Sequence, residues 1–316
     1  MSNPEHNTFT LALAQAHTLG EGLQWHAPSG RWWWTDIEGA CIHAWTPGAT
    51  ATLQVRLPER VGSFVHSCSG ALVLAMAKRV ARLTLPDLQA TGSVAAEPAM
   101  LATLAPLEIH LSANRANDGR CDRSGAFVFG TMHETEPRQP LGSFYQYTPA
   151  HGLRRLALDG VAIANSICFS LDGRRMYYCD TTQGRIMVCN YDSAAALVSE
   201  PRPFVKKDAG EGSPDGSTID AQGCLWNAQW GAGTVVRYGT DGRQLARHAV
   251  PVPNATCPAF GGPAGDQILV TTARQELSTA ELMARPMSGS LFGMRVEPGL
   301  FLGETLFDDE DRPSPA

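Results

Sequence analysis

The sequence lacks the features that mark several large classes of protein. No run of eighteen apolar residues predicts a membrane-spanning helix, and the first twenty residues show no basic stretch ahead of an apolar one. Lysine and arginine form no run, and 25 basic against 31 acidic side chains give a net charge of −6. This balance argues against a nucleic-acid or anionic-membrane partner. We expect a soluble cytoplasmic chain, a monomer or weak homo-oligomer, with a small molecule as its partner.

Common catalytic and metal-binding motifs are missing as well. The eight cysteines include no Cys-x-x-Cys pair and lie mostly in apolar runs, which is typical of buried thiols in a reducing compartment. No Gly-x-Ser-x-Gly elbow, His-Glu-x-x-His helix or glycine-rich phosphate loop occurs. The sequence therefore disfavours serine nucleophiles, thiolate metal sites and nucleotide binding.

Helical periodicity is scarce, and only residues 277–286 suggest a short helix. Elsewhere the chain consists of short β-rich runs bounded by Gly, Pro, Asp or Ser, such as "RWWWTDI" and "AFVFGTM". Six similar turns precede six such runs, and their glycines are Gly30, Gly70, Gly125, Gly173, Gly223 and Gly265. Their spacing of 40 to 55 residues is the size of one four-stranded propeller blade. The prediction is an all-β, six-bladed β-propeller, with a pair of β-sandwiches as the alternative.

The propeller prediction has three further parts. We expect one domain over residues 1–307, closed by the strand-like "FTLALAQA" joining the last blade, and a frayed tail over 308–316. In "WWW", Trp32–Trp34, alternation along a strand points the middle ring away from the outer two. This pattern favours packing between blades over a sugar-stacking platform.

Counting back from the hairpin glycines finds polar residues at one position of the repeat. Asn117, Asn165 and Asp215 each stand eight residues before their glycine, and Glu21 stands nine before Gly30, whose turn holds one extra residue. The Asp-Gly steps of "ANDGRC" and "SPDGST" are therefore not hairpins but open the innermost strands. Each polar residue alone could cap a loop. Together, at one position of four blades, they predict a site in the central channel.

Two blades carry small residues at this position, Gly62 and Cys257, which leave room for a ligand. Carboxylate and amide oxygens are the ligands of hard divalent cations. Few protein ligands leave open positions for water and substrate, as Lewis-acid catalysis requires. The sequence therefore predicts a central metal site.

At these residues the chain resembles the gluconolactonase and regucalcin (senescence-marker-protein) family of six-bladed propellers. The resemblance rests on "LGEGLQWHAPSGRWWWTDIEG", "RANDGRCDRSGAFVFGTM", "IANSICFSLDGRRMYYCDT" and "SPDGSTIDAQGCLWNAQWG". A fifth stretch, "CPAFGGPAGDQILVTTARQELSTAELMARPMSGSLFGM", is most similar to bacterial sugar lactonases of the xylonolactonase and arabinolactonase kind. The matches follow in order over nearly the whole chain. One departure is Ser166, where the family usually has Gly.

The resemblance implies a function and a set of site residues. The resemblance implies that the family's metal ligands correspond to Glu21, Asn165 and Asp215. It implies that the substrate-binding residues correspond to Arg115, Asn117 and an acidic residue after "GTM", here Glu134. His133 is a further candidate to line the same part of the site. The implied reaction is hydrolysis of a sugar lactone to its aldonate with one divalent ion (Ca²⁺, Mg²⁺, Mn²⁺, Zn²⁺ or Fe²⁺), and we assign the general base to Asp215. The alternatives are a phosphotriesterase-like esterase and a calcium-binding regulatory propeller without turnover.

Overall fold

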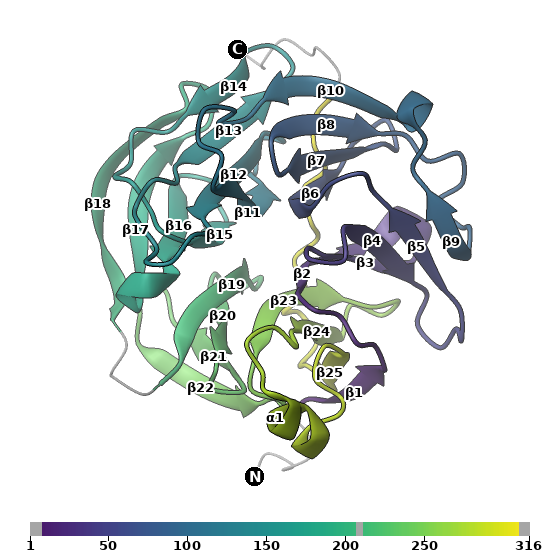
Figure 1. Ribbon diagram of the computed structural model, residues 1–316. Coiled ribbons are helices and arrows are strands. Elements are labelled where there is room, and N and C mark those ends of the chain that lie inside the picture. Colours follow the sequence, from purple (N-terminus) through teal and green to yellow (C-terminus); the bar gives the residue numbers. More distant parts are fainter. Residues whose placement is uncertain (1–7, 207–210, 310–316) are drawn as a thin grey trace.

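The computed structural model describes residues 8–206 and 211–309, and the predicted six-bladed β-propeller is confirmed. Its sheets stand around a central axis, and Figure 1 looks roughly along that axis. Five sheets have four strands and one has five. Sequential antiparallel pairing within each blade follows from the regular glycine turns, because every hairpin returns the chain beside the strand that it has just left.

The first three blades carry residues of the first half of the chain. Blade 1 contains β2 (Gly20–His26), β3 (Arg31–Asp36), β4 (Cys41–Trp45), β5 (Thr52–Arg56) and, added in parallel to β5, β9 (Gly92–Ala95). Blade 2 contains β6 (Val61–His66), β7 (Leu72–Met76), β8 (Arg79–Leu83) and β10 (Leu101–Pro106). Blade 3 contains β11 (Asn114–Cys121), β12 (Phe127–His133), β13 (Phe144–Thr148) and β14 (Gly152–Arg155).

The last three blades complete the ring. Blade 4 contains β15 (Ala164–Phe169), β16 (Arg175–Asp180), β17 (Arg185–Asp192) and β18 (Leu197–Lys206). Blade 5 contains β19 (Ser213–Ile219), β20 (Leu225–Trp230), β21 (Thr234–Tyr238) and β22 (Gln244–Ala249). Blade 6 contains β23 (Ala255–Gly261), β24 (Gln267–Thr272), β25 (Leu291–Arg295) and β1 (Thr10–Leu13). The N-terminal strand therefore closes the ring on β25, as predicted.

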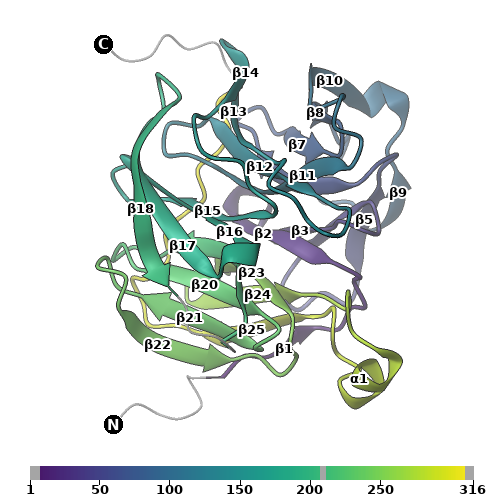
Figure 2. The same ribbon diagram turned by 60° about the vertical axis from the view of Figure 1, so that its left-hand side comes forward.

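Helical structure is short and peripheral. The predicted helix is α1 (Thr279–Ala284), which begins with a capping box between Ser278 and Glu281, and Figure 2 shows it projecting beside blade 6. In the described residues, 3₁₀ turns occur at η2 (Ala27–Ser29), η3 (Pro98–Met100) and η4 (Thr181–Gln183). No helix within the described ranges has the length and apolar character needed to cross a membrane.

The core lies between neighbouring blades. Trp33 packs with Phe64 and Leu72 of blade 2, whereas Trp32 and Trp34 pack in a cluster shared with blade 6. All three tryptophans are fully buried. The predicted alternation and inter-blade packing of this triplet are confirmed. Burying each such ring contributes about 2–3 kcal/mol, so the contacts between blades are a main source of stability.

Glycine has two separate roles in this fold. The six hairpin glycines all adopt positive φ, between 62° and 87°, as their turn positions require. Gly119 and Gly216 of the two Asp-Gly steps are not hairpin glycines, as predicted, but they lie inside β11 and β19, which begin before these steps and not at them. A Cβ on Gly119 would lie 2.5 Å from the Phe129 Cβ, so glycine here permits the close approach of strands around the axis.

The segment after blade 6 runs from blade 5 toward blades 2 and 3. The Ala221 amide donates to the Leu300 carbonyl at 3.0 Å, and the Phe307 amide donates to the His66 carbonyl at 2.7 Å. Between these anchors Glu304 forms an ion pair with Arg120 of β11. Of the tail for which fraying was predicted, 308–309 are hydrogen-bonded to loops of blades 2 and 3, and 310–316 lie outside the described residues.

Candidate active site

A β-bulge in each innermost strand sets the direction of the side chains that reach the channel. In β2 the register shifts between Glu21 and Gln24, and in β15 between Asn165 and Cys168. Corresponding shifts occur in β6, β11, β19 and β23. A bulge places two residues opposite one and re-aims the local side chains, which is why bulges recur beside active sites.

The structure brings five of the six residues predicted for the site to one cavity of about 360 Å³. These residues are Glu21, Arg115, Asn117, Asn165 and Asp215, which come from β2, β11, β15 and β19. Each is no more than 8% exposed. Counting positions in the repeat therefore identified side chains that meet, although they are up to 194 residues apart (215 − 21) in the sequence.

Hydrogen bonds fix the amide groups of this set. Arg115 Nη1 donates to Asn117 Oδ1 at 2.7 Å, and Asn117 Nδ2 donates to Asn165 Oδ1 at 3.1 Å. Asn165 Nδ2 donates to Thr181 Oγ1 at 2.9 Å. Since both amides are held at their nitrogen and oxygen ends, Asn165 keeps its oxygen on the side of Asn117 and the cavity.

The carboxylates of the site are electrostatically destabilised in their charged form. Burial, with a further contribution from Asp118, raises the pKa of Glu21 to about 8. Burial and the neighbouring Glu21 and Asp118 raise the pKa of Asp215 well above its ordinary value. Two buried carboxyl groups that repel each other form a site that a divalent cation would neutralise.

The donor set of this site suits a hard cation. Within the described part of the chain, no three His, Cys, Asp or Glu side chains come together as a metal-ligand group. A metal site here would therefore depend on the amide oxygen of Asn165 beside the carboxylates of Glu21 and Asp215. Two carboxylates and one amide oxygen fit a cation that keeps part of its shell as water.

Asp118 is a third buried carboxylate near the axis that the sequence reasoning did not single out. Its Oδ2 accepts from the Ile167 amide at 2.8 Å, and burial raises its pKa. The signal was available, because Asp118 is the next residue after Asn117 in "ANDG". Counting from the hairpin glycine leads to Asn117, and the neighbouring Asp118 does not fall at that position of the repeat.

Ser166, the departure from the family pattern, occupies a left-handed backbone position. Its φ is 61°, the same as that of Gly22, which follows Glu21 in β2. A non-glycine residue is strained there, and Ser166 Oγ is held by donating to the Asp215 carbonyl at 2.7 Å. The serine thus ties the bulge of β15 to the backbone of Asp215.

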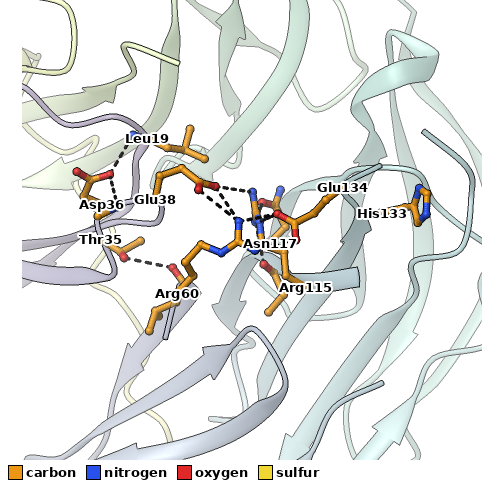
Figure 3. A network of polar contacts seen from close by, with 12 residues as sticks. Leu19, Thr35, Asp36, Glu38, Arg60, Arg115, Asn117, His133 and Glu134 are labelled. Atoms are coloured by element: carbon orange, nitrogen blue, oxygen red, sulfur yellow. Dashed lines mark hydrogen bonds and ion pairs between the residues drawn. The ribbon is translucent and has the colours of Figure 1, made fainter. Parts of the chain in front are cut away.

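Glu134 and His133 lie outside the lining of the cavity that the other five residues share. Both Glu134 carboxylate oxygens accept from Arg60, at 2.6 and 2.8 Å, and Arg115 Nε donates to the same carboxylate at 3.1 Å (Figure 3). Glu134 does not line the cavity. The His133 ring lies apart from this cluster and accepts from the Gln139 amide (Figure 3). Direct contact of Glu134 with a substrate stays a prediction.

The cavity is also lined by residues that the sequence did not assign to a site. Apolar wall is supplied by Leu19, Met132, Ile163 and Trp230, and polar wall by Glu136, Arg138, Thr181, Thr182, Ser213, Gln275 and Glu276. Most lie at strand ends or in loops, and such residues have no equivalent position in the other blades from which a site could be predicted. The lining of the cavity therefore combines charged and amide groups with several apolar side chains.

Comparison with known proteins gives one consistent result. The family model described as "SMP-30/Gluconolactonase/LRE-like region" matches residues 19–274. An L-arabinolactonase of Azospirillum brasilense is 39% identical over 285 residues, covering 90% of each chain. A pentonolactonase of Haloferax volcanii is 30% identical over 267 residues, covering 84% of this chain and 85% of the relative.

The structural comparison agrees. A crystal structure of a calcium-binding protein, regucalcin, from Agrobacterium tumefaciens superposes with a TM-score of 0.84 at 31% identity, covering 95% of this chain and 98% of that one. The family resemblance expected from the sequence motifs is confirmed by both kinds of comparison. This chain belongs to the SMP-30/gluconolactonase/regucalcin-like family.

Proposed function

We propose that this protein hydrolyses a sugar lactone to the open-chain aldonic acid. The observation that carries the proposal is the cavity in which Glu21, Asp215, Asn165, Asn117 and Arg115 converge. Relatives that share most of the chain are named arabinolactonase and pentonolactonase, which agrees with a cyclic ester as substrate. A ligand with several hydroxyl groups suits the polar lining of this cavity.

We infer that Glu21, Asn165 and Asp215 hold one divalent ion, whether Ca²⁺, Mg²⁺, Mn²⁺, Zn²⁺ or Fe²⁺. The similarity to a calcium-binding regucalcin supports a divalent ion, and oxygen-only ligands favour a hard one. When bound, such an ion supplies Lewis-acid polarisation of the ester carbonyl.

The side chains supply the proton transfers and the orientation of the substrate. Asp215 accepts a proton from the water whose oxygen attacks the lactone carbonyl carbon. The bond between that carbon and the ring oxygen then breaks, and Asp215 returns the proton to the ring oxygen, leaving a carboxylic acid and a free hydroxyl group. No other reactant is needed, because water supplies both added groups.

Arg115 and Asn117 present complementary groups to a sugar. Arg115 Nη1 donates to the Ala116 carbonyl and to Asn117, and Nε donates to Glu134. Nη2 lies 4.0 Å from Glu38 Oε1, beyond hydrogen-bond distance, and is the nitrogen that we assign to the substrate. Both N–H groups of Asn117 are used by Ala164 and Asn165. Its Oδ1 keeps one lone pair that can accept from a sugar hydroxyl.

The test of the base assignment is Asp215→Asn, with Asp172→Asn as the matched control. Asp172 is an exposed carboxylate in a hairpin turn of blade 4 and lies outside the cavity. Acid release from xylono-, arabinono-, galactono- and gluconolactone would be followed in a pH-stat. We expect Asp215→Asn to abolish turnover with its circular dichroism unchanged, and Asp172→Asn to retain wild-type rates. Wild-type turnover by Asp215→Asn would refute the assignment.

The calcium-binding name of the regucalcin structure also favours a second candidate, a binding propeller without turnover. This candidate predicts tight Ca²⁺ binding together with no acid release from any lactone. A phosphotriesterase-like activity would instead appear as turnover of an organophosphate ester. Measurement of Ca²⁺ affinity and of both hydrolytic activities on the same preparation separates the three functions.

A further inference from the structure

A charged cluster lies beside the cavity and reaches its lining through one residue. We call it the rim cluster; it consists of Glu38, Arg60, Arg115 and Glu134, and Figure 3 shows Arg60 between the two glutamates. Arg115 alone of the four lines the cavity. The members come from three blades, because Glu38 follows β3, Arg60 precedes β6, and Arg115 and Glu134 belong to blade 3.

The contacts of Arg60 leave Glu134 little freedom. Arg60 Nη1 and Nη2 donate to the two oxygens of Glu134 at 2.6 and 2.8 Å, a two-pronged geometry that sets the plane of the carboxylate. Arg60 Nη1 also donates to both oxygens of Glu38, at 3.1 and 3.3 Å. The side chains of Arg60 and Glu134 are 32% and 28% exposed, so this pair is only partly screened by water.

Glu134 passes this orientation on to Arg115. Its Oε1 accepts from Arg115 Nε at 3.1 Å, while Arg115 Nη1 donates to Asn117 at 2.7 Å. Fixing Nε and Nη1 of a planar guanidinium group fixes the direction of Nη2, which lies 4.0 Å from Glu38 Oε1 and is the nitrogen assigned to the substrate. The Arg115 side chain is only 4% exposed, so solvent offers few competing partners.

We propose that Arg60 is a positioning residue for substrate binding, acting through Glu134 on Arg115. This proposal rests on the proposed lactonase function, and no contact between Arg60 and a substrate is needed. With Arg60 removed, Glu134 can offer both oxygens to Arg115. The guanidinium group of Arg115 then turns from Asn117 toward Glu134, and the direction of Nη2 changes.

The experiment compares Arg60→Met with Arg60→Lys and with Arg79→Met. Arg79 is the matched control, because its Nε lies 2.7 Å from Glu59, both side chains are 27% exposed, and neither residue lines the cavity. For the lactone that the wild type hydrolyses fastest, we expect Arg60→Met to raise KM roughly 3–30-fold with kcat within about twofold. Arg60→Lys should recover part of the loss, since an ammonium group cannot pair with both oxygens in a fork. Arg79→Met should match the wild type.

A double-mutant cycle measures whether the effects of two substitutions on KM depend on each other, which a general structural role of Arg60 would not produce. Arg60→Met and Glu134→Gln should not be additive in KM, because both interrupt the same path to Arg115. Additive effects, an equal KM in Arg60→Met and Arg79→Met, or a loss confined to kcat would overturn the proposal.

A crystal structure of Arg60→Met separates this proposal from the proposed function. If the wild type hydrolyses no lactone, the function fails, and the position of Arg115 still tests the inference. Rotation of the Arg115 guanidinium away from Asn117 supports the proposal. An Arg115 that keeps its bond to Asn117 in the variant refutes it, whatever the substrate proves to be.

Discussion

The left-handed serine at the bulge of β15 permits a quantitative test of the local structure. Ser166 is fully buried, and its Oγ donates to the Asp215 carbonyl at 2.7 Å. The same oxygen accepts from Ser217 Oγ at 3.1 Å and from Asn227 Nδ2 at 3.0 Å. Replacing Ser166 with Ala removes these hydrogen bonds and keeps the backbone strain, whereas replacing it with Gly removes both.

The free energies of unfolding of the two variants should therefore differ in a known direction. Loss of hydrogen bonds from a buried group costs about 1–3 kcal/mol in either variant. Glycine relieves left-handed strain of about 1–2 kcal/mol and adds about 0.5–1 kcal/mol of chain entropy to the unfolded state. We expect the order of stability wild type, Ser166→Gly, Ser166→Ala, with about 0.5–1 kcal/mol between the two variants.

The assay is urea unfolding of the three proteins, followed by tryptophan fluorescence and circular dichroism. Coincident transitions with equal slopes allow the midpoints to be compared directly. Two results would refute the reasoning. A Ser166→Ala midpoint at or above that of Ser166→Gly would show that the φ of 61° carries no strain, and an unchanged midpoint in both would show that the Oγ contacts contribute nothing.

Three further predictions concern single positions. A Cβ on Gly62 would lie 2.3 Å from the Ala116 carbonyl oxygen, so Gly62→Ala should destabilise the fold by about 3 kcal/mol or more, measured as a fall in the urea midpoint. Burial alone would raise the pKa of Asp36, but hydrogen bonds from His17 and Leu19 bring it below its ordinary value. A lowered carboxyl pKa contributes stability above the unfolded pKa of about 3.9 that is lost as pH falls through the folded value, so Asp36→Asn should lose less stability than the wild type between about pH 5 and pH 2. Arg115→Ala should mainly raise KM, and a loss of kcat alone in steady-state kinetics would contradict its binding role.

The arrangement of the blades and the main site residues were predictable because each repeat contains a glycine from which positions can be counted. Each hairpin needs a glycine at positive φ, so the glycines mark the same structural point in six blades. Counting from that point found Glu21, Asn117, Asn165 and Asp215, which do line one cavity. The triplet of tryptophans was also predictable, since alternation along a strand follows from the backbone alone.

Other features depend on contacts that no repeat position encodes. Each of the six innermost strands contains a bulge, so comparing the spacing from one blade with that of another does not reveal the bulges. Arg60 contacts Glu134 across the boundary between two blades. Because Arg60 lies in a loop, it has no equivalent position in the other blades with which it could be compared. Trp230 is the last residue of β20, and its place at the cavity follows from where that strand ends. Loop and inter-blade geometry is set by the assembled fold, so local patterns could not reveal it.

The most direct test of the central claim is acid release from a panel of aldonolactones by protein stripped with a chelator and then supplied with one divalent ion at a time. We expect hydrolysis of one or two lactones that is lost when the metal is removed and restored by a specific ion. Circular dichroism and the melting temperature would establish that each preparation is folded. If folded protein hydrolyses no lactone with any of the ions, the proposed metal-dependent lactonase function is wrong.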